Sequence, residues 1–407
     1  MRILFITTAN LSTNPRLYKE IVLAESLGHR ISFIAFHQGG WSDETDLTLV
    51  KKTQPHSYYL SALRTPFWPW LISSFLNNLC IRIWPLFKHS LWITSIAHNK
   101  RTFPILKQLS RVHEHYDLVI GHNLGALYPS WSFAKRANIP FGFDVEDYYP
   151  GEASAKTNRH EVRRREVLMS ELLPKAIYYS CASPMIGLQT HKLLDSYNAI
   201  KRIVINNCFS QADFKLPVPN RDKLRMVWFS QNINQGRGLE WTLPVLDQLG
   251  DSITLTLIGA VNSVFYEEYI KGRGYIEIVQ PLEQKTLNLS LSGYDVGLAL
   301  ELNTADLNRQ LCLTNKIWGY LQAGLFILAT DTPAQREFIT EHPMHGILTS
   351  QDKQSFMQAV EKIILDKDRI RLEAKERYVK AQAFNWETES RKLEGMWREM
   401  VENTVGR

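Results

Sequence analysis

The sequence has few cysteines and none of the cysteine patterns that bind zinc or build a disulfide framework. Its four cysteines, in 407 residues, lie far apart, with no CxxC pair and no histidine at metal-ligand spacing. This spacing is typical of structural thiols in a reducing compartment. No apolar run approaches the roughly 18 residues of a membrane-spanning helix, and the apolar run at residues 2–6 is too short for a signal peptide. We therefore expect a cytoplasmic protein.

Acidic residues are absent from one long stretch of the chain. Residues 47–113 contain no Asp or Glu but nine Lys or Arg. Aromatic residues lie among them, interleaved with Leu and Ile: Phe67, Trp68, Trp70, Phe75, Trp84, Phe87 and Trp92. This mixture is typical of a surface that contacts an anionic membrane. The alternatives are an ordinary pair of core helices with solvated cations, and a nucleic-acid surface, for which the sequence has no motif.

The order of apolar runs predicts an α/β protein with two domains. Residues 2–6 and 29–36 are typical of buried strands, and they flank a helix from Pro15 to Leu27, which makes a βαβ unit. A second series begins at residues 224–230, after a proline-bearing segment. We predict doubly wound parallel-sheet domains at 1–210 and 211–385, with 47–113 as a basic aromatic insertion. A last helix, 386–407, is predicted to return to the first domain.

Polar residues follow two of the predicted strands in the first domain. Ligands bind at the carboxyl ends of parallel strands. His122 follows one strand and either faces this edge or packs inside the domain. Asp144, Glu146 and Asp147 follow the next strand, where three carboxylates need a cation, arginines or sugar hydroxyls nearby.

The most distinctive segment is residues 313–337, LTNKIWGYLQAGLFILATDTPAQRE. Thr314 is placed to cap the N-terminus of a helix, and Gly324 ends that helix because glycine tolerates the left-handed conformation. Residues 326–329 follow as a short buried strand. The helix start offers free N–H groups and a positive dipole end, with Lys316 in the first turn, and this combination suits a phosphate.

That segment resembles the donor-binding segment of GT-B glycosyltransferases, and of glycosyltransferase family 4 in particular. The resemblance rests on these residues: Asn315, Lys316, Tyr320, Gly324, Ala329, Thr330 and Glu337. The family usually has acids at the positions of Gly319 and Leu311, where they hold the donor's ribose and sugar hydroxyls. Glu301 or Arg309, from the loop before this segment, would replace the missing acid or a cation in the donor pocket.

The resemblance implies two facing Rossmann-like domains with a cleft between them. It further implies sugar transfer from a nucleotide-diphosphate donor to a hydroxyl, with retention of configuration and without a metal or other cofactor. Arg237 takes the place of a family cation on the donor's diphosphate. The implied donor-binding residues are Arg237, Gly238, Gly259, Glu301, Arg309, Thr314, Asn315, Lys316 and Glu337.

The first domain would bind the acceptor. Asp144 or Glu146 would take the proton from the acceptor hydroxyl, and His122 is a further catalytic candidate. Asn14, Arg16 and Asp147 are acceptor-binding candidates, although Arg16 would equally pair with Glu20 four residues later.

The basic aromatic stretch favours a lipid-linked or lipopolysaccharide-type acceptor at the inner face of the cell membrane, and a role in cell-surface polysaccharide synthesis. Two other functions stay open. One is a nucleotide-sugar 2-epimerase, and the other is a non-catalytic scaffold of the same fold.

Overall fold

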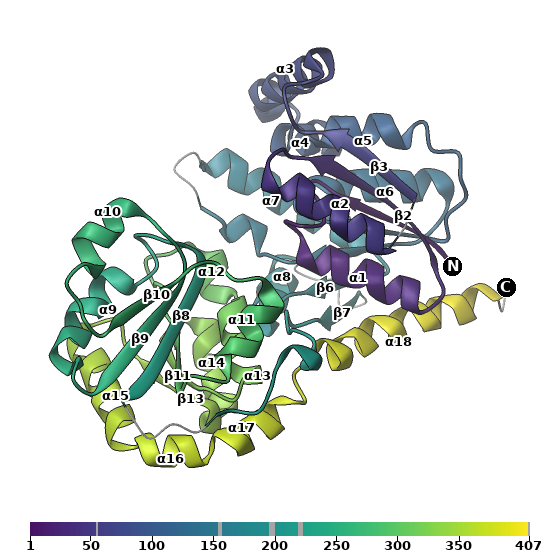
Figure 1. Ribbon diagram of the computed structural model, residues 1–407. Coiled ribbons are helices and arrows are strands. Elements are labelled where there is room, and N and C mark those ends of the chain that lie inside the picture. The colour runs from purple at the N-terminus through teal and green to yellow at the C-terminus, as the bar shows by residue number, and fades with distance from the viewer. Residues whose placement is uncertain (54–55, 154–156, 195–199, 219–222, 406–407) are drawn as a thin grey trace. The chain divides into compact units, whose positions relative to one another are not determined.

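The computed structural model describes residues 1–53, 56–153, 157–194, 200–218 and 223–405 (Figure 1). The chain divides into two compact units. Unit 1 comprises Met1–Ile205 and Glu394–Arg407, and unit 2 comprises Asn206–Leu393.

Unit 1 is built on a seven-stranded parallel sheet in the order β3-β2-β1-β4-β5-β6-β7. Its strands are β1 (Arg2–Thr7), β2 (Arg30–His37), β3 (His56–Ser61), β4 (Leu118–His122), β5 (Phe141–Val145), β6 (Tyr178–Cys181) and β7 (Lys201–Val204). Its helices are α1 (Pro15–Ser26), α2 (Trp41–Thr53), α3 (Phe67–Ile83), α4 (Leu91–His98), α5 (Thr102–Leu109), α6 (Leu124–Ala137), α7 (Arg159–Leu172) and α8 (Pro184–Leu193).

Unit 2 is built on a six-stranded parallel sheet in the order β10-β9-β8-β11-β12-β13. Its strands are β8 (Leu224–Ile233), β9 (Ile253–Val261), β10 (Ile276–Val279), β11 (Val296–Ala299), β12 (Phe326–Thr330) and β13 (Gly346–Thr349). Its helices are α9 (Leu239–Leu246), α10 (Ser263–Phe265), α11 (Gln284–Leu291), α12 (Leu307–Leu311), α13 (Asn315–Gln322), α14 (Pro333–Glu341), α15 (Lys353–Leu365), α16 (Lys367–Leu372) and α17 (Ala374–Ala381). Helix α18 (Trp386–Val405) begins in unit 2 and ends in unit 1.

Two doubly wound parallel sheets with flanking helices confirm the predicted fold class. Central strands such as β12 are buried along their whole length, as expected for strands covered on both faces. Gly324, which follows the C-cap Ala323 of α13, has a φ of 76°, as expected for a glycine that ends the helix. Gly297 on β11 lets α13 approach the sheet, because a Cβ there would lie 2.2 Å from the ring of Tyr320.

The acid-free stretch 47–113 forms both sheet and helix. Residues 56–61 are the edge strand β3, which the sequence did not predict. Helix α3 extends away from the sheet and packs on α4 and α5 (Figure 1). Trp84, one of the aromatics expected at a membrane, is instead buried with Cys80 and Ile96. Trp68 and Phe75 are exposed by 69% and 63%. In the part of the chain that the structure describes, no helix combines the length and apolar character needed to cross a membrane.

Candidate functional site

Unit 2 has a topological switch point between β8 and β11. From β8 the chain winds outward through β9 and β10, then returns to the other side of β8 with β11. Ligands in open parallel sheets bind at the carboxyl edge of such a point. The loop after β8 contains Gly236 and Gly238, both with positive φ, and it reaches the end of β11, because a Cβ on Gly238 would lie 3.1 Å from Leu300 Cβ. Arg237, between the two glycines, is exposed.

Glu301 is the centre of an ionic cluster at this edge. Its carboxylate lies 3.1 Å from Arg309 Nη2 and 3.4 Å from Lys316 Nζ. Glu301 is 2% exposed and Lys316 is 8% exposed. The main chain of Glu301 is held by Thr330 at the end of β12. Glu301 N–H donates to Thr330 Oγ1 at 2.7 Å, and that hydroxyl donates back to Glu301 O. Two cations face one carboxylate, so the cluster carries one net positive charge.

Helix α13 begins at the same edge. Lys316 lies in its first turn, with Nζ 5.6 Å from the ring centre of Trp228. Asn315 is exposed, and its Oδ1 accepts a hydrogen bond from Asn207 Nδ2 at 2.6 Å. Thr314 occupies the N-cap position, as predicted, but its side chain accepts no hydrogen bond from the first turn. Ile317 N–H donates to Thr314 O, and the N–H groups before it receive no bond from the Thr314 side chain, which leaves them open for another acceptor.

Gly259 and Glu337 complete the predicted donor residues. Gly259 has a φ of 151°, and a Cβ there would lie 2.0 Å from the backbone oxygen of Ser230, so β8 and β9 approach closely only with glycine at this position. The ladder between these strands is irregular from Phe229 to Asn232. Glu337 lies on α14, where burial, with a smaller contribution from Glu341, raises the pKa of its carboxyl.

The positions where the family has acids are packing positions in this chain. Leu311 is 4% exposed. A Cβ on Gly319 would lie 3.4 Å from Phe229 Cζ and from Leu291 Cδ1, so a longer acidic side chain would be directed among apolar atoms. Glu301, which is placed by β11, supplies a carboxylate at this edge instead.

In unit 1, Arg16 and Asp144 form a buried ion pair. Arg16 Nε and Nη2 donate to the two carboxylate oxygens of Asp144 at 2.8 and 2.7 Å, and Nη1 donates to Ile205 O at 2.8 Å. Ser180 Oγ donates to Asp144 at 2.6 Å. These contacts correct the expected pairing of Arg16 with Glu20, because the guanidinium reaches from α1 to the end of β5. All three guanidinium nitrogens of Arg16 therefore donate within unit 1, whereas the sequence analysis proposed that Arg16 binds the acceptor. Arg16 is also only 3% exposed.

His122 lies inside unit 1 between two carboxylates. Its Nε2 is 3.3 Å from Glu20 Oε2, its Nδ1 is 3.6 Å from Asp144 Oδ2, and the ring is fully buried. Burial alone would lower the pKa of His122, but the carboxylates of Glu20 and Asp144 raise it above its ordinary value. This buried placement favours the interpretation that His122 packs inside the domain over the interpretation that it faces a ligand at the carboxyl edge of the sheet.

Glu20, His122 and Asp144 also have ligand atoms within 4.8 Å of one another, a spacing that suits a metal ion. The guanidinium of Arg16 already pairs with both oxygens of Asp144, and a second cation close to this guanidinium would be repelled, so we assign no metal to the group.

Glu146 differs from Asp144 although the two lie two residues apart. Burial and the neighbouring carboxylate of Asp147 raise the pKa of Glu146 to about 7, while Arg16 and His122 limit the rise. Arg16 and Ser180 hold the pKa of Asp144 below its ordinary value, although burial alone would raise it. Asp144 is thus fixed as a carboxylate with its oxygens in use, whereas Glu146 is only partly buried and suited to gain or lose a proton near neutral pH.

Asn14 has a local structural role. Its side chain caps α1 by accepting from Leu17 N–H at 3.1 Å, and the residue is 1% exposed. The sequence assigned Asn14 to the acceptor, but its amide oxygen is directed at its own helix.

Sequence reasoning missed three contacts of the site residues: Glu20 with His122, Ser180 with Asp144, and Thr330 with Glu301. The strand register was the available signal for Ser180, because His122 pairs with Asp144, and Asp144 with Ser180, across adjacent parallel strands. Residues that end neighbouring strands at equivalent positions are brought together in such a sheet.

Comparisons with family models and with curated proteins find no match. Solved structures do match over nearly the whole chain. HepE of Anabaena, in complex with UDP-glucose, aligns at 14% identity with a TM-score of 0.65 and covers 100% of both chains. Sucrose-phosphate synthase from Thermosynechococcus elongatus aligns at 12% identity and 0.65, over 99% of this chain and 100% of the other. A UDP-N-acetylglucosamine 2-epimerase aligns at 12% identity and 0.53, over 100% and 97%. The chain therefore has the two-domain GT-B fold.

Proposed function

We propose that this protein is a glycosyltransferase that moves a sugar from a nucleoside-diphosphate donor to a hydroxyl group of an acceptor. The observation that carries the proposal is the meeting of Arg309, Lys316 and Glu301 at the switch point of unit 2, where the loop of Arg237 also ends. The net positive charge of this cluster complements a diphosphate. HepE and sucrose-phosphate synthase, which share the fold, support the same interpretation.

The chemistry follows from charge that develops on the leaving diphosphate. As the bond to the sugar breaks, negative charge grows on the diphosphate oxygens, and Lys316, Arg309 and the free N–H groups at the start of α13 stabilise it. These fixed cations supply the charge that a divalent metal supplies in other transferases, so we propose a metal-independent reaction. Retention of configuration is proposed from the resemblance to family 4.

Glu146 is our candidate for the base that accepts the proton of the acceptor hydroxyl. Its raised pKa and partial exposure support this role better than the ion-paired Asp144. The acid-free stretch and the exposed apolar residues of α3 support a lipid-linked or membrane-held glycan acceptor, as in polysaccharide or lipopolysaccharide synthesis.

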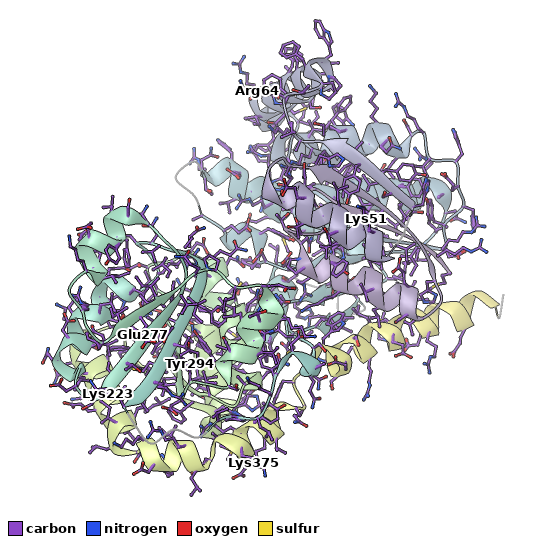
Figure 2. The ribbon with its side chains drawn as sticks, viewed as in Figure 1. Lys51, Arg64, Lys223, Glu277, Tyr294 and Lys375 are labelled. Atoms are coloured by element: carbon purple, nitrogen blue, oxygen red, sulfur yellow. The ribbon has the colours of Figure 1, made fainter. Side chains whose placement is uncertain are left out.

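Calorimetric titration of UDP, GDP and ADP into the wild type and into Lys316→Ala tests the donor site. We expect one nucleotide to bind at micromolar strength, and the substitution to weaken binding by tenfold or more, about 1.4 kcal/mol. Lys375→Ala, an exposed lysine on α17 (Figure 2), is the matched control and should bind as the wild type does. Absence of binding by all three nucleotides would reject the donor site and favour a scaffold.

The epimerase alternative has a separate readout. Its support is the structural likeness to a 2-epimerase, which has a lower TM-score than the likenesses to HepE and sucrose-phosphate synthase. An epimerase would convert a UDP-sugar without any acceptor, and the product sugar would stay attached to the nucleotide. A transferase would release free UDP instead, which a coupled assay distinguishes.

A further inference from the structure

Unit 1 contains a cavity of about 370 Å³ at the carboxyl ends of β2 and β3. The start of α3 and one face of α5 complete its lining. The volume lies within the range of roughly 300–1,000 Å³ that is usual for small-molecule sites. None of the residues assigned above to the donor or to the acceptor hydroxyl lines this cavity, so it is a separate part of the unit.

The lining of the cavity is basic. No Asp or Glu from the described part of the chain belongs to it, whereas four cations do: Lys100, Arg101, Lys107 and Arg111. Arg101 is engaged from behind, because it donates to the backbone oxygen of Thr8. The side chains of the other three form no ion pair within the described residues. Cations that gather around one hollow repel one another unless an anion lies between them, so the lining favours an anionic ligand.

These cations are spread along the cavity. Lys100 and Arg101 precede α5, Lys107 lies in its last turn, and Arg111 follows its end. The eight residues of α5 span roughly 12 Å at a rise of 1.5 Å per residue. Positive charges spread over this distance match an extended ligand with repeated negative groups better than one compact anion such as phosphate.

Much of the remaining lining is apolar and flat. It includes the aromatic rings of Tyr59 and Trp70 and three prolines. A sugar ring presents a face of C–H groups, and such a face packs well against the negative face of an aromatic ring. The side-chain amide of Gln108, which also lines the cavity, suits the hydroxyl groups of a sugar. An inorganic polyanion would use neither the rings nor the amide in this way.

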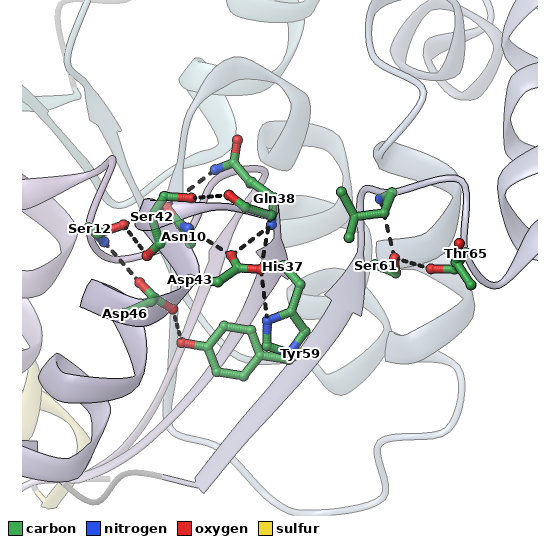
Figure 3. Close-up of polar contacts among 12 residues, drawn as sticks. Asn10, Ser12, His37, Gln38, Ser42, Asp43, Asp46, Tyr59, Ser61 and Thr65 are labelled. Atoms are coloured by element: carbon green, nitrogen blue, oxygen red, sulfur yellow. Dashed lines mark hydrogen bonds and ion pairs between the residues drawn. The ribbon is translucent and has the colours of Figure 1, made fainter.

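The aromatic side of the cavity is held in place from behind (Figure 3). Tyr59 hydroxyl donates to Asp46 of α2. His37 stacks on Tyr59 at 4.5 Å between ring centres and lies 3.8 Å from Asp43 of the same helix. The loop between β3 and α3 is closed by Ser61 hydroxyl, which donates to Thr65 O at 2.8 Å. A cavity with walls fixed in this way needs little reorganisation to bind a ligand.

We propose that this cavity binds a short run of sugar residues in an acidic glycan, whose carboxylate groups meet the cations and whose rings lie against Tyr59 and Trp70. The proposal rests on the proposed function, because it gives the acceptor its chemical class, a chain of sugars that carry carboxylates.

The place of the cavity in the sheet fits this role. The cavity and Glu146 lie at the same edge of one sheet, and strands β2 and β5 are three steps apart in it, roughly 14 Å at the usual strand spacing. A glycan held in the cavity by its inner residues can therefore extend along this edge and bring its terminal hydroxyl to Glu146.

Calorimetric titration of trigalacturonate and of trimannuronate tests the proposal with an α-linked and a β-linked acidic chain. Two further probes separate charge from sugar. The methyl ester of each trisaccharide keeps the rings and loses the charge, whereas inorganic tripolyphosphate keeps the charge and has no rings. We expect one acidic trisaccharide to bind roughly tenfold or more tightly than its methyl ester, its own monosaccharide and tripolyphosphate.

Three variants locate the binding. Lys107→Gln/Arg111→Gln should lose roughly tenfold or more in affinity for that trisaccharide. Trp70→Leu should also weaken it, and should leave the weaker binding of tripolyphosphate unchanged, because only a sugar ring uses the aromatic face. Lys51→Gln, at an exposed lysine of the same acid-free stretch that lies on α2 (Figure 2) outside the cavity, should bind as the wild type does.

Failure of both acidic trisaccharides to bind, or equal binding of a methyl ester, would overturn the proposal, because repeated carboxylates would then not be what the cavity recognises. Equal binding of tripolyphosphate would overturn it as well, since the site would then take any polyanion. Equal losses in the double variant and in Lys51→Gln would reduce the attraction to a diffuse charge effect and reject the cavity.

UDP titration separates this proposal from the proposed function. A chain that binds UDP but neither acidic trisaccharide loses the cavity proposal alone. A chain that binds an acidic trisaccharide but no nucleotide keeps the glycan site and loses the transferase.

Discussion

Charged residues at the carboxyl edge of the unit 1 sheet fall into two electrostatic kinds. Arg16, Asp144, His122 and Glu20 are buried and contact one another, so they position one another and the helix α1 that carries two of them. A group of this kind is costly to disrupt, because removing one member leaves another charge buried without compensation. Glu146 differs, because burial and the adjacent carboxylate of Asp147 raise its pKa more than Arg16 and His122 lower it.

This difference predicts an unusual effect of Glu146→Gln on stability. A carboxyl whose pKa rises on folding, here from 4.5 to about 7, favours the folded state while it is protonated. That contribution is complete below the pKa of the unfolded chain and is lost as pH rises through about 7. We expect Glu146→Gln to raise the melting temperature by roughly 2–8 °C at pH 8 and to have no effect at pH 4, while sugar transfer at pH 8 falls by roughly 100-fold or more.

Thermal unfolding at the two pH values, followed by calorimetry, measures this effect. Glu44→Gln, an exposed residue of α2, should change the melting temperature at neither pH. A loss of stability in Glu146→Gln at pH 8 would show that the carboxylate is a structural partner, contrary to our assignment.

Residues that we propose to touch a ligand were easier to select from the sequence than the residues that hold them. Lys316, Arg237 and Glu301 stand out because a cation or an acid follows a strand or opens a helix. The partner of Arg16 could not be predicted in the same way, because Asp144 is 128 residues away and only the strand order brings the two together. The i, i+4 neighbour Glu20 was the local alternative, and the fold placed it against His122 instead.

At the level of elements, the close approach of β8 and β9 depends on one position. Gly259→Ala would place a Cβ 2.0 Å from a backbone oxygen, which cannot turn away as a side chain does. We expect this substitution to lower the free energy of unfolding by roughly 1–3 kcal/mol and to weaken nucleotide binding by tenfold or more, because the loops after both strands must move.

Urea denaturation and UDP titration of Gly259→Ala measure the two losses. Gly274→Ala is the matched control, since a Cβ there meets nothing within 4 Å, and it should be neutral or slightly stabilising. Normal binding by Gly259→Ala would remove this strand end from the donor site.

Most strands were predicted because they are buried on both faces and therefore appear as continuous apolar runs. Strand β3 was missed because it is an edge strand, in which none of the six residues is buried. Its Tyr58 and Tyr59 lie in the basic aromatic stretch, where the absence of acids favoured a surface that contacts a membrane. Residue propensities alone did not predict a strand at this position, and the strand is defined by its pairing with β2.

At the level of the whole molecule, positive charge is concentrated in one stretch. Residues 47–113 contain nine cations and no acid, while the chain as a whole has a net charge of +6, so the other residues together carry a net charge of −3. A molecule with this distribution is attracted to an anionic surface through one region, and the exposed residues of α3 can then enter the interface.

We predict that the protein co-sediments with vesicles that contain phosphatidylglycerol and much less with vesicles of phosphatidylcholine alone. The variant Trp68→Ser/Phe75→Ser should bind the anionic vesicles at least tenfold less, because it removes apolar area at the tip of the basic region. Its affinity for UDP should be unchanged.

Leu365→Ser/Leu372→Ser provides the control for these vesicle measurements. Both leucines belong to unit 2 and are exposed by 85% and 84%, so they are at least as accessible as the α3 residues. Equal losses in the two double variants would mean that exposed apolar area in general, and no particular helix, governs the association.

Helix α18 links the completion of unit 1 to the order in which the chain is made. Trp397, which is fully buried, donates from Nε1 to Tyr178 hydroxyl at 3.1 Å and packs against His29. The ribosome must therefore synthesise all of residues 206–393 after the first sheet has emerged and before this tryptophan is available. At about 5–20 residues per second, that interval is roughly 10–40 s. During this interval the first unit has an open place in its core, which a nascent chain must keep from aggregation until its last helix is made.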